Sequence, residues 1–230
     1  MKNKPIKEKI MKIMLLSQKY LILSLFMCLI IQSGFSQNLN ENPELDKMVK
    51  EFLSDNNYSW RDMNIPASDG QLLFNIIVEN GYKNVVEIVT STGHSGVWIA
   101  WALSKTGGKL ITLEIDAQRH KEALANFKEA GVSDYVDARL CDAHEMVLQL
   151  EGPIDFVFSD ADKGWYTNYF KAIAPKLDVG GCYVSHNISQ RRRQVGITEY
   201  VNYIESLSNY NTTYNNNGGG VSISYKTSAN

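Results

Sequence analysis

The chain has 230 residues, of which 44% are hydrophobic and 21% charged, with a formal net charge of −2. Without the first 36 residues, which read as a leader, 17 basic residues face 24 acidic ones and the net charge is near −7. This acidic balance argues against a non-specific nucleic-acid binder, and the remaining length suits one domain with a full core.

Residues 1–36 have the pattern of a secretory signal peptide. Six lysines and one glutamate precede a 12-residue apolar run, Tyr20–Ile31, which is too short to span a bilayer comfortably. Gly34 and Ser36 then place small residues at the −3 and −1 positions of a cleavage before Gln37. We therefore expect an exported protein, periplasmic or secreted, with no stable membrane span after cleavage.

Two helices are predicted next along the chain. Residues 37–62 form an N-terminal extension in which apolar residues recur at helical spacing over Leu45–Leu53. A second helix opens at Pro66 and Ser68 and stops at Gly81.

From Asn84 onward, strand patterns alternate with helical ones. The predicted strands are Asn84–Ile88, Lys109–Ile115, Tyr135–Leu140, Ile154–Ser159 and Cys182–Ser185, and the helices between and after them are Ser95–Ser104, Ala117–Ala130, Ala143–Leu150, Trp165–Leu177 and Ile197–Leu207. Such alternation predicts a doubly wound α/β fold with a mostly parallel, Rossmann-like sheet. Two more strands, Asn211–Tyr214 and Val221–Tyr225, close the chain as an antiparallel hairpin and bring the sheet to seven strands. One domain thus covers residues 63–230.

Polar residues follow several of these strands where each strand ends. They are the Thr92-Gly-His-Ser95 loop, Glu114, Asp160-Ala-Asp-Lys163 and His186-Asn187. An open α/β sheet binds its ligand at this edge. Taken alone, each of these residues also has a purely structural interpretation. Glu114 could be a solvated surface charge, Asp160 could be a helix N-cap, and Lys163 could form a surface ion pair with Asp162. A dinucleotide site is disfavoured, since Gly-x-Gly-x-x-Gly is absent.

The first loop and Glu114 have complementary chemistry. A helix beginning at Ser95 presents backbone N–H groups and the positive end of its dipole, which favour a carboxylate. An ionised Glu114 offers two acceptor oxygens to a pair of hydroxyl donors.

The chain resembles the S-adenosylmethionine-dependent O-methyltransferases of the metal-assisted catechol and caffeoyl-coenzyme A group, over roughly Met63 to Lys226. The resemblance is most specific at Asp160-Ala-Asp-Lys163 and the following Trp165-Tyr-Thr-Asn-Tyr-Phe170. It implies a methyltransferase fold with the terminal hairpin. It also implies that S-adenosylmethionine is bound by Ile65, Glu87, Thr92, Gly93, Ser95, Glu114, Ala143 and Asp160.

The resemblance further implies a divalent metal held by Asp160, His186 and Asn187, with Lys163 as general base on the acceptor hydroxyl. A hard cation would polarise a catechol-like pair of oxygens. The family usually has aspartate at position 186. A histidine there shifts preference from magnesium toward a transition metal, and otherwise His186 is a base or a hydrogen-bonding core residue.

Position 89 also departs from the family, which usually has glycine where the backbone passes the cofactor. A β-branched side chain resists positive φ. Either Val89 keeps a β-like backbone and tolerates the ligand, or the cofactor site is weakened.

We therefore predict an exported O-methyltransferase that acts on a small hydroxylated acceptor. We expect that it can form a homodimer and that it has no nucleic-acid partner. The alternative is a non-catalytic exported binding module on a degenerate methyltransferase scaffold. Binding of S-adenosylmethionine separates the two.

Overall fold

The computed structural model describes residues 39–55, 64–189, 194–216 and 219–229, which belong to one compact unit. The predicted signal peptide and residues 37–38 and 56–62 of the predicted extension lie outside the described residues. Within the described part, no helix combines the length and apolar character that crossing a membrane requires.

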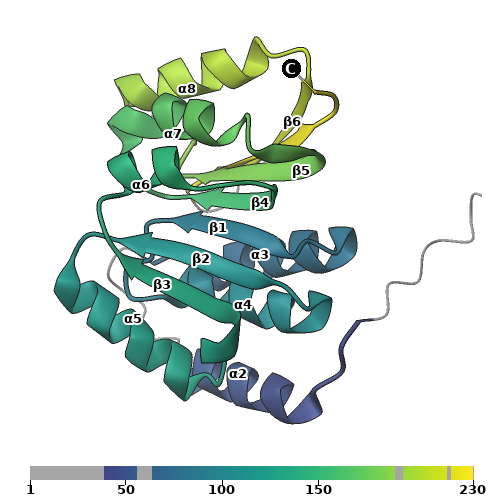
Figure 1. Ribbon diagram of the computed structural model, residues 1–230, viewed down its shortest axis with the longest axis vertical. Coiled ribbons are helices and arrows are strands. Elements are labelled where there is room, and N and C mark those ends of the chain that lie inside the picture. The colour runs from purple at the N-terminus through teal and green to yellow at the C-terminus, as the bar shows by residue number, and fades with distance from the viewer. Residues whose placement is uncertain (1–38, 56–63, 190–193, 217–218, 230) are drawn as a thin grey trace, which may run out of the picture. The chain divides into compact units, whose positions relative to one another are not determined.

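The described residues form a seven-stranded sheet in the order β3-β2-β1-β4-β5-β7-β6 (Figure 1). The strands are β1 (Asn84–Ile88), β2 (Lys109–Glu114), β3 (Val136–Leu140), β4 (Ile154–Ser159), β5 (Leu177–His186), β6 (Tyr210–Asn215) and β7 (Val221–Lys226). The first five are parallel, whereas β7 runs antiparallel to both β5 and β6. The predicted fold class and the predicted terminal hairpin are confirmed.

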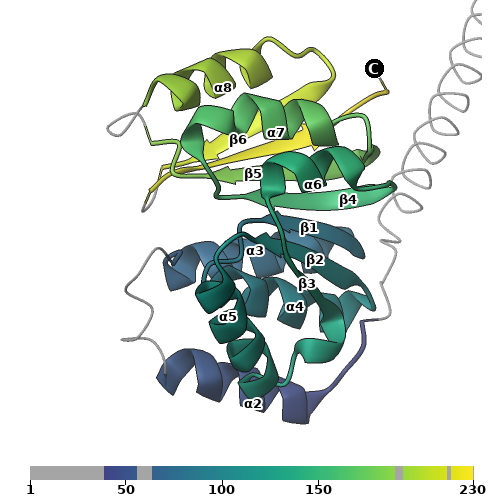
Figure 2. The same ribbon diagram turned by 60° about the vertical axis from the view of Figure 1, so that its left-hand side comes forward.

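Helices cover both faces of the sheet (Figures 1 and 2). α3 (Ala67–Asn80) and α4 (His94–Thr106) pack on one face, and α6 (Ala143–Gln149), α7 (Tyr166–Ile173) and α8 (Val195–Glu205) pack on the other. Successive strand residues point to opposite faces, so Val85 joins the α3–α4 core and Val86 joins the α6–α8 core. Both faces of the sheet are therefore buried, as a parallel sheet requires.

α4 lies in the interior of one layer. Nearly all of its residues are buried, because α2 (Pro43–Asp55), α3 and α5 (Ala117–Glu129) pack around it. Gly70 permits the close approach of α3 to α4, since a Cβ atom there would overlap the indole ring of Trp98. The beginning of α3 is thereby fixed against α4.

The boundary between α7 and β5 differs from the prediction. The helix expected over Trp165–Leu177 ends at Ile173, and the strand expected over Cys182–Ser185 spans Leu177–His186. Pro175 explains the early end, because proline has no N–H with which to continue the helical hydrogen bonds; the last of them runs from Ala174 N to Phe170 O.

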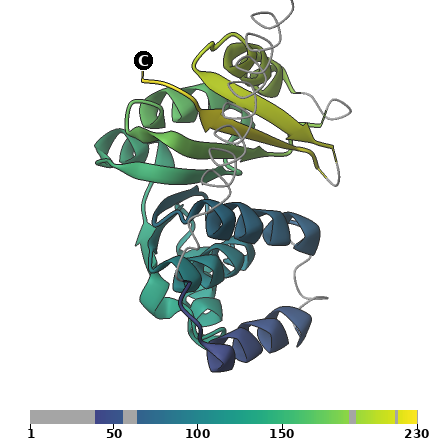
Figure 3. The same ribbon diagram turned by 90° about the vertical axis from the view of Figure 1, so that its right-hand side faces the viewer.

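The terminal hairpin is the last part of the sheet in the described chain. β7 lies between β5 and β6 (Figure 3). Its register pairs Val221 with His186 at the end of β5. This antiparallel pairing positions His186 at the edge where the parallel strands end.

Candidate active site

A cavity of about 650 Å³ opens at the carboxyl edge of the sheet. The predicted site residues among its lining are Ile65, Ser95, Glu114, Asp160, Lys163, His186 and Asn187. Glu87, Thr92, Gly93 and Ala143, which were also predicted, are buried or packed outside the lining. The structure therefore brings the predicted cofactor loop and the Asp160–Lys163 segment to one cavity.

The loop after β1 has an unusual backbone. Val89 has a φ of 78° and Ser91 a φ of 50°, so the β-like alternative considered for Val89 is wrong. This conformation is strained for a β-branched residue. Hydrogen bonds to β2 hold it, since Thr90 N donates to Leu113 O at 2.9 Å and the Thr90 and Thr112 hydroxyls are 2.5 Å apart. Val89 lines the cavity without filling it.

Glu114 ties this loop to the segment that follows β2. Its carboxylate accepts hydrogen bonds from the backbone N–H groups of Ser91 at 2.7 Å, Asp116 at 2.9 Å and Ile115 at 3.1 Å. A carboxylate has about four lone-pair directions, so one remains available to a ligand hydroxyl. Glu114 is therefore an anchored acceptor in the cavity wall rather than the solvated charge considered from the sequence.

The start of α4 requires glycine. Gly93 is the N-cap residue with a φ of 94°, and a Cβ atom there would lie 3.0 Å from the Phe127 ring. Thr92 is held on both sides, because the Asn126 amide donates to its carbonyl at 2.8 Å and the Asn64 amide to its hydroxyl at 3.1 Å. Thr92 and Gly93 thus shape the loop while Ser95 faces the cavity.

Glu87 is a fully buried carboxyl group beside the cavity. Its Oε2 atom accepts a hydrogen bond from the Thr112 hydroxyl at 2.6 Å, and Oε1 has no hydrogen-bond partner among the described residues. Burial raises its pKa to about 7, and the hydroxyls of Ser95 and Thr112 offset only part of that rise. Such a group holds a proton near neutral pH until a cationic ligand group approaches.

The pKa of Glu87 predicts a specific pH dependence of stability. Because the pKa rises from 4.5 to about 7 on folding, the stabilising contribution is complete at low pH and declines as the pH rises through this interval. Relative to Glu87→Gln, which mimics the protonated acid, the wild-type protein should lose about 3 kcal/mol of unfolding free energy over this interval. Urea unfolding at a series of pH values measures the difference.

The control for this experiment is Glu122→Gln, the same chemical change at an exposed position on α5. Its unfolding free energy should follow the wild-type pH profile. Parallel profiles for wild type and Glu87→Gln would contradict the raised pKa.

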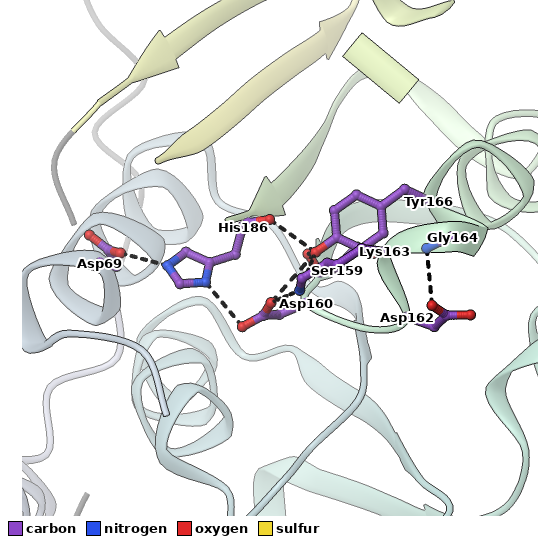
Figure 4. A network of polar contacts seen from close by, with 8 residues as sticks. All are labelled: Asp69, Ser159, Asp160, Asp162, Lys163, Gly164, Tyr166 and His186. Atoms are coloured by element: carbon purple, nitrogen blue, oxygen red, sulfur yellow. Dashed lines mark hydrogen bonds and ion pairs between the residues drawn. The ribbon is translucent and has the colours of Figure 1, made fainter. Parts of the chain in front are cut away.

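Asp160, Lys163 and Tyr166 form a compact cluster after β4 (Figure 4). Lys163 Nζ lies 2.5 Å from Asp160 Oδ1 and 2.8 Å from the Tyr166 hydroxyl. The Tyr166 hydroxyl in turn donates to the carbonyl of His186 at 2.9 Å. The ion pair considered for Lys163 thus forms with Asp160, whereas Asp162 caps the next turn by accepting from Gly164 N at 3.0 Å.

His186 lies between two carboxylates (Figure 4). Its Nδ1 is 3.0 Å from Asp160 Oδ2, and its Nε2 is 2.9 Å from Asp69 Oδ2. Sequence reasoning missed Asp69, which is at the start of α3 and there resembles an ordinary first-turn acid. Its 3% exposure, visible only in the fold, marks it as part of this network.

The charges in this network support one another. Burial would lower the pKa of His186, but its hydrogen bonds to Asp160 and Asp69 and their negative charges raise it to about 9. Burial would likewise raise the pKa of Asp160, yet His186 and Lys163 bring it below the usual range. The four side chains therefore alternate in sign, as anion, cation, anion and cation.

These residues do not fit a divalent cation as they are arranged. Both ring nitrogens of His186 and both carboxylate oxygens of Asp160 already have side-chain partners. Asn187 lines the cavity in a left-handed conformation, with a φ of 59°, but no second side chain joins it as a ligand. Across the described ranges of the chain, no group of three histidine, cysteine or acidic residues is placed to hold a metal ion.

Ala143 is the first residue of α6 and is outside the cavity lining. It is buried behind the N-cap residue Asp142, whose side chain accepts from His144 N at 2.8 Å. Its predicted contact with a cofactor remains a prediction.

Solved O-methyltransferases share this fold. The O-methyltransferase from Bacillus cereus in complex with SAH aligns with a TM-score of 0.66 and 22% identity over 82% of this chain and 92% of that one. TomG from Streptomyces achromogenes, in complex with SAM, aligns with a TM-score of 0.67 and 22% identity over 86% of this chain and 95% of that one. At this identity the likeness establishes the methyltransferase fold.

A family model described as O-methyltransferase matches residues 35–195, so the chain belongs to the O-methyltransferase family. Caffeoyl-CoA O-methyltransferase 1 from Eucalyptus globulus is 33% identical over 144 residues, which are 60% of this chain and 57% of that protein. Catechol O-methyltransferase from Niastella koreensis is 42% identical over 93 residues, or 39% of this chain and 42% of that protein. The chain thus matches about half the length of these curated relatives.

Proposed function

We propose that this protein is an exported S-adenosylmethionine-dependent O-methyltransferase acting on a small hydroxylated, catechol-like acceptor. One observation carries the proposal: a single cavity joins the Ser95–Glu114 wall to the Asp160–Lys163 pair. The cavity therefore contains groups that can bind a nucleoside-like cofactor together with a lysine that can accept a proton. Family membership supports the same conclusion.

The residues at one end of the cavity suit S-adenosylmethionine. Glu114 has one free acceptor direction for a ribose hydroxyl, and Ser95 lines the cavity at the start of α4. Glu87, just outside the lining, is a buried acid without a cationic partner. The buried hydroxyl of Ser91 also lacks a partner within the described chain. The cofactor would supply an electrophilic methyl group on a sulfonium centre.

Lys163 is the proposed general base on the acceptor hydroxyl. Two of the three positions around its Nζ are directed to Asp160 and Tyr166, which leaves the third for the cavity. Lys163 would act as a base only after its ammonium group has lost a proton to solvent. The neutral Nζ would then take the hydroxyl proton, and the Asp160 carboxylate would stabilise the ammonium that forms again. Positioning of the two reactants is the main contribution of the cavity walls. No step of this mechanism uses a metal.

Isothermal titration calorimetry with S-adenosylhomocysteine tests the cofactor site. The wild-type domain should bind it, and Glu114→Ala should bind about 10- to 100-fold more weakly, because hydrogen bonds to a charged group are lost. Glu122→Ala, at an exposed position on α5, is the matched control and should bind like the wild type. No binding by wild type at millimolar ligand would favour the non-catalytic binding module.

Export is proposed from the lysine-rich leader, the apolar run Tyr20–Ile31 and the small residues before Gln37. The first residue of the protein recovered outside the cytoplasm should be Gln37, which N-terminal sequencing determines.

A homodimer is likewise proposed, and measurement of the molecular mass in solution tests it. The acidic charge of the exported part is consistent with a small-molecule acceptor and no nucleic-acid partner.

A further inference from the structure

We propose that this site works without a bound divalent cation, because a side-chain bridge from Asp69 through His186 to Asp160 occupies the groups that would bind one. The inference rests on the proposed function for the reaction, although metal binding can be measured without it.

Both ring nitrogens of His186 are hydrogen-bonded to carboxylates. Ionised carboxylates only accept hydrogen bonds, so a histidine with a carboxylate at each ring nitrogen donates from both of them. The two distances, 2.9 and 3.0 Å, are those of charge-assisted bonds of ordinary length. A ring nitrogen that carries a proton has no lone pair for a metal ion, so His186 is not a ligand in this arrangement.

Asp160 has a positively charged neighbour at each of its two oxygens. Its Oδ2 faces His186 and its Oδ1 faces Lys163, so two positive groups flank one carboxylate. A divalent cation at Asp160 would have to displace at least one of them or lie against both. Like charges that close repel one another, and more strongly in a partly buried site than in water.

The total charge of the network gives the same result. Asp69, His186, Asp160 and Lys163 sum to zero when all four are ionised, so the network does not attract a cation. An aspartate at position 186 would change the sum to −2 and would place three carboxylates around the same point. Hard cations require such an oxygen-rich, negatively charged set of ligands.

The bridge is also difficult to open. The side chains of His186 and Asp69 are 5% and 4% exposed, and Gly70 fixes the start of α3 against Trp98. Separating the pair would leave a buried charge without its partner, which is among the costliest changes in a protein interior. We infer that protonated His186 supplies, between Asp69 and Asp160, the positive charge that a metal ion would otherwise supply.

Titration of Mn²⁺, followed by electron paramagnetic resonance or calorimetry, tests the inference directly. Wild-type protein should bind no Mn²⁺ up to about 1 mM, whereas His186→Asp should gain a site with a dissociation constant of about 10⁻⁵ to 10⁻³ M. His120→Asp, which adds the same negative charge on α5 outside the cavity lining, should stay without one. Circular dichroism establishes that each variant is folded.

Two outcomes would overturn the inference. One is Mn²⁺ binding by wild-type protein that Asp160→Ala abolishes. The other is a folded His186→Asp variant that gains no site. Binding of S-adenosylhomocysteine, measured on the same samples, separates the test of the proposed function from the test of metal binding. If the protein does not bind S-adenosylhomocysteine, the proposed function is contradicted, but the Mn²⁺ result still holds. Turnover of the wild-type protein should also be unchanged by EDTA.

Discussion

Replacing Lys163 with alanine should lower the rate of methyl transfer by about 10²- to 10⁴-fold, the usual contribution of a general base. The lysine lies 2.5 Å from Asp160 and opens to the cavity, but it is on the β4 side, away from Glu114. Its removal should therefore lower kcat while the affinity for S-adenosylhomocysteine stays near that of the wild type. Steady-state kinetics and calorimetry together measure both quantities.

Lys171→Ala is the matched control for this variant. It removes the same side chain from the exposed surface of α7, where Lys171 lies over the Tyr203 ring. Turnover of this control should be close to that of the wild type. If Lys163→Ala turned over as fast as the control, Lys163 would not be the base.

Replacing His186 with leucine should lower the free energy of unfolding by about 3 to 5 kcal/mol, the usual cost of leaving a buried charge unpaired. Asp69 would lose its partner at 2.9 Å with only 4% of its side chain exposed. Asp160 would keep Lys163 but lose its bond to Nδ1. Urea denaturation measures the change.

The chain contains a matched control for this substitution too. His144 also lies between two carboxylates, 3.3 Å from Asp142 and 3.8 Å from Asp162, but 37% of its side chain is exposed. Exposed ion pairs contribute about 0 to 1 kcal/mol, so His144→Leu should change stability little. Equal losses in the two variants would show that the buried bridge adds nothing beyond what the exposed pairs contribute. Adding Asp69→Asn to His186→Leu should restore part of the stability, because it removes the unpaired charge.

Much of the fold was predictable because its signals are local. Apolar runs ending in polar residues indicated the parallel strands, and strand ends meet at one edge, so Glu114 and Asp160 were expected at one site. The cavity contains both. The end of α7 was missed although Pro175 was visible, because the helical pattern continued past it.

The role of His186 could not be read from the sequence alone. Its partner Asp69 is 117 positions away and comes from a helix whose place is fixed by packing against α4. The sequence left open a metal ligand, a base and a hydrogen-bonding core residue, and the contacts support the last of these. The positive φ of Val89 was equally hidden, since it depends on hydrogen bonds that the loop makes with a neighbouring strand.

The place of β7 has a consequence for biogenesis. Because this strand inserts between β5 and β6, the ribosome must complete residues 221–226 before the sheet can close. Until then, the β5 edge lacks its partner strand. Late closure of the sheet is compatible with the export proposed above, because translocation channels pass unfolded chains.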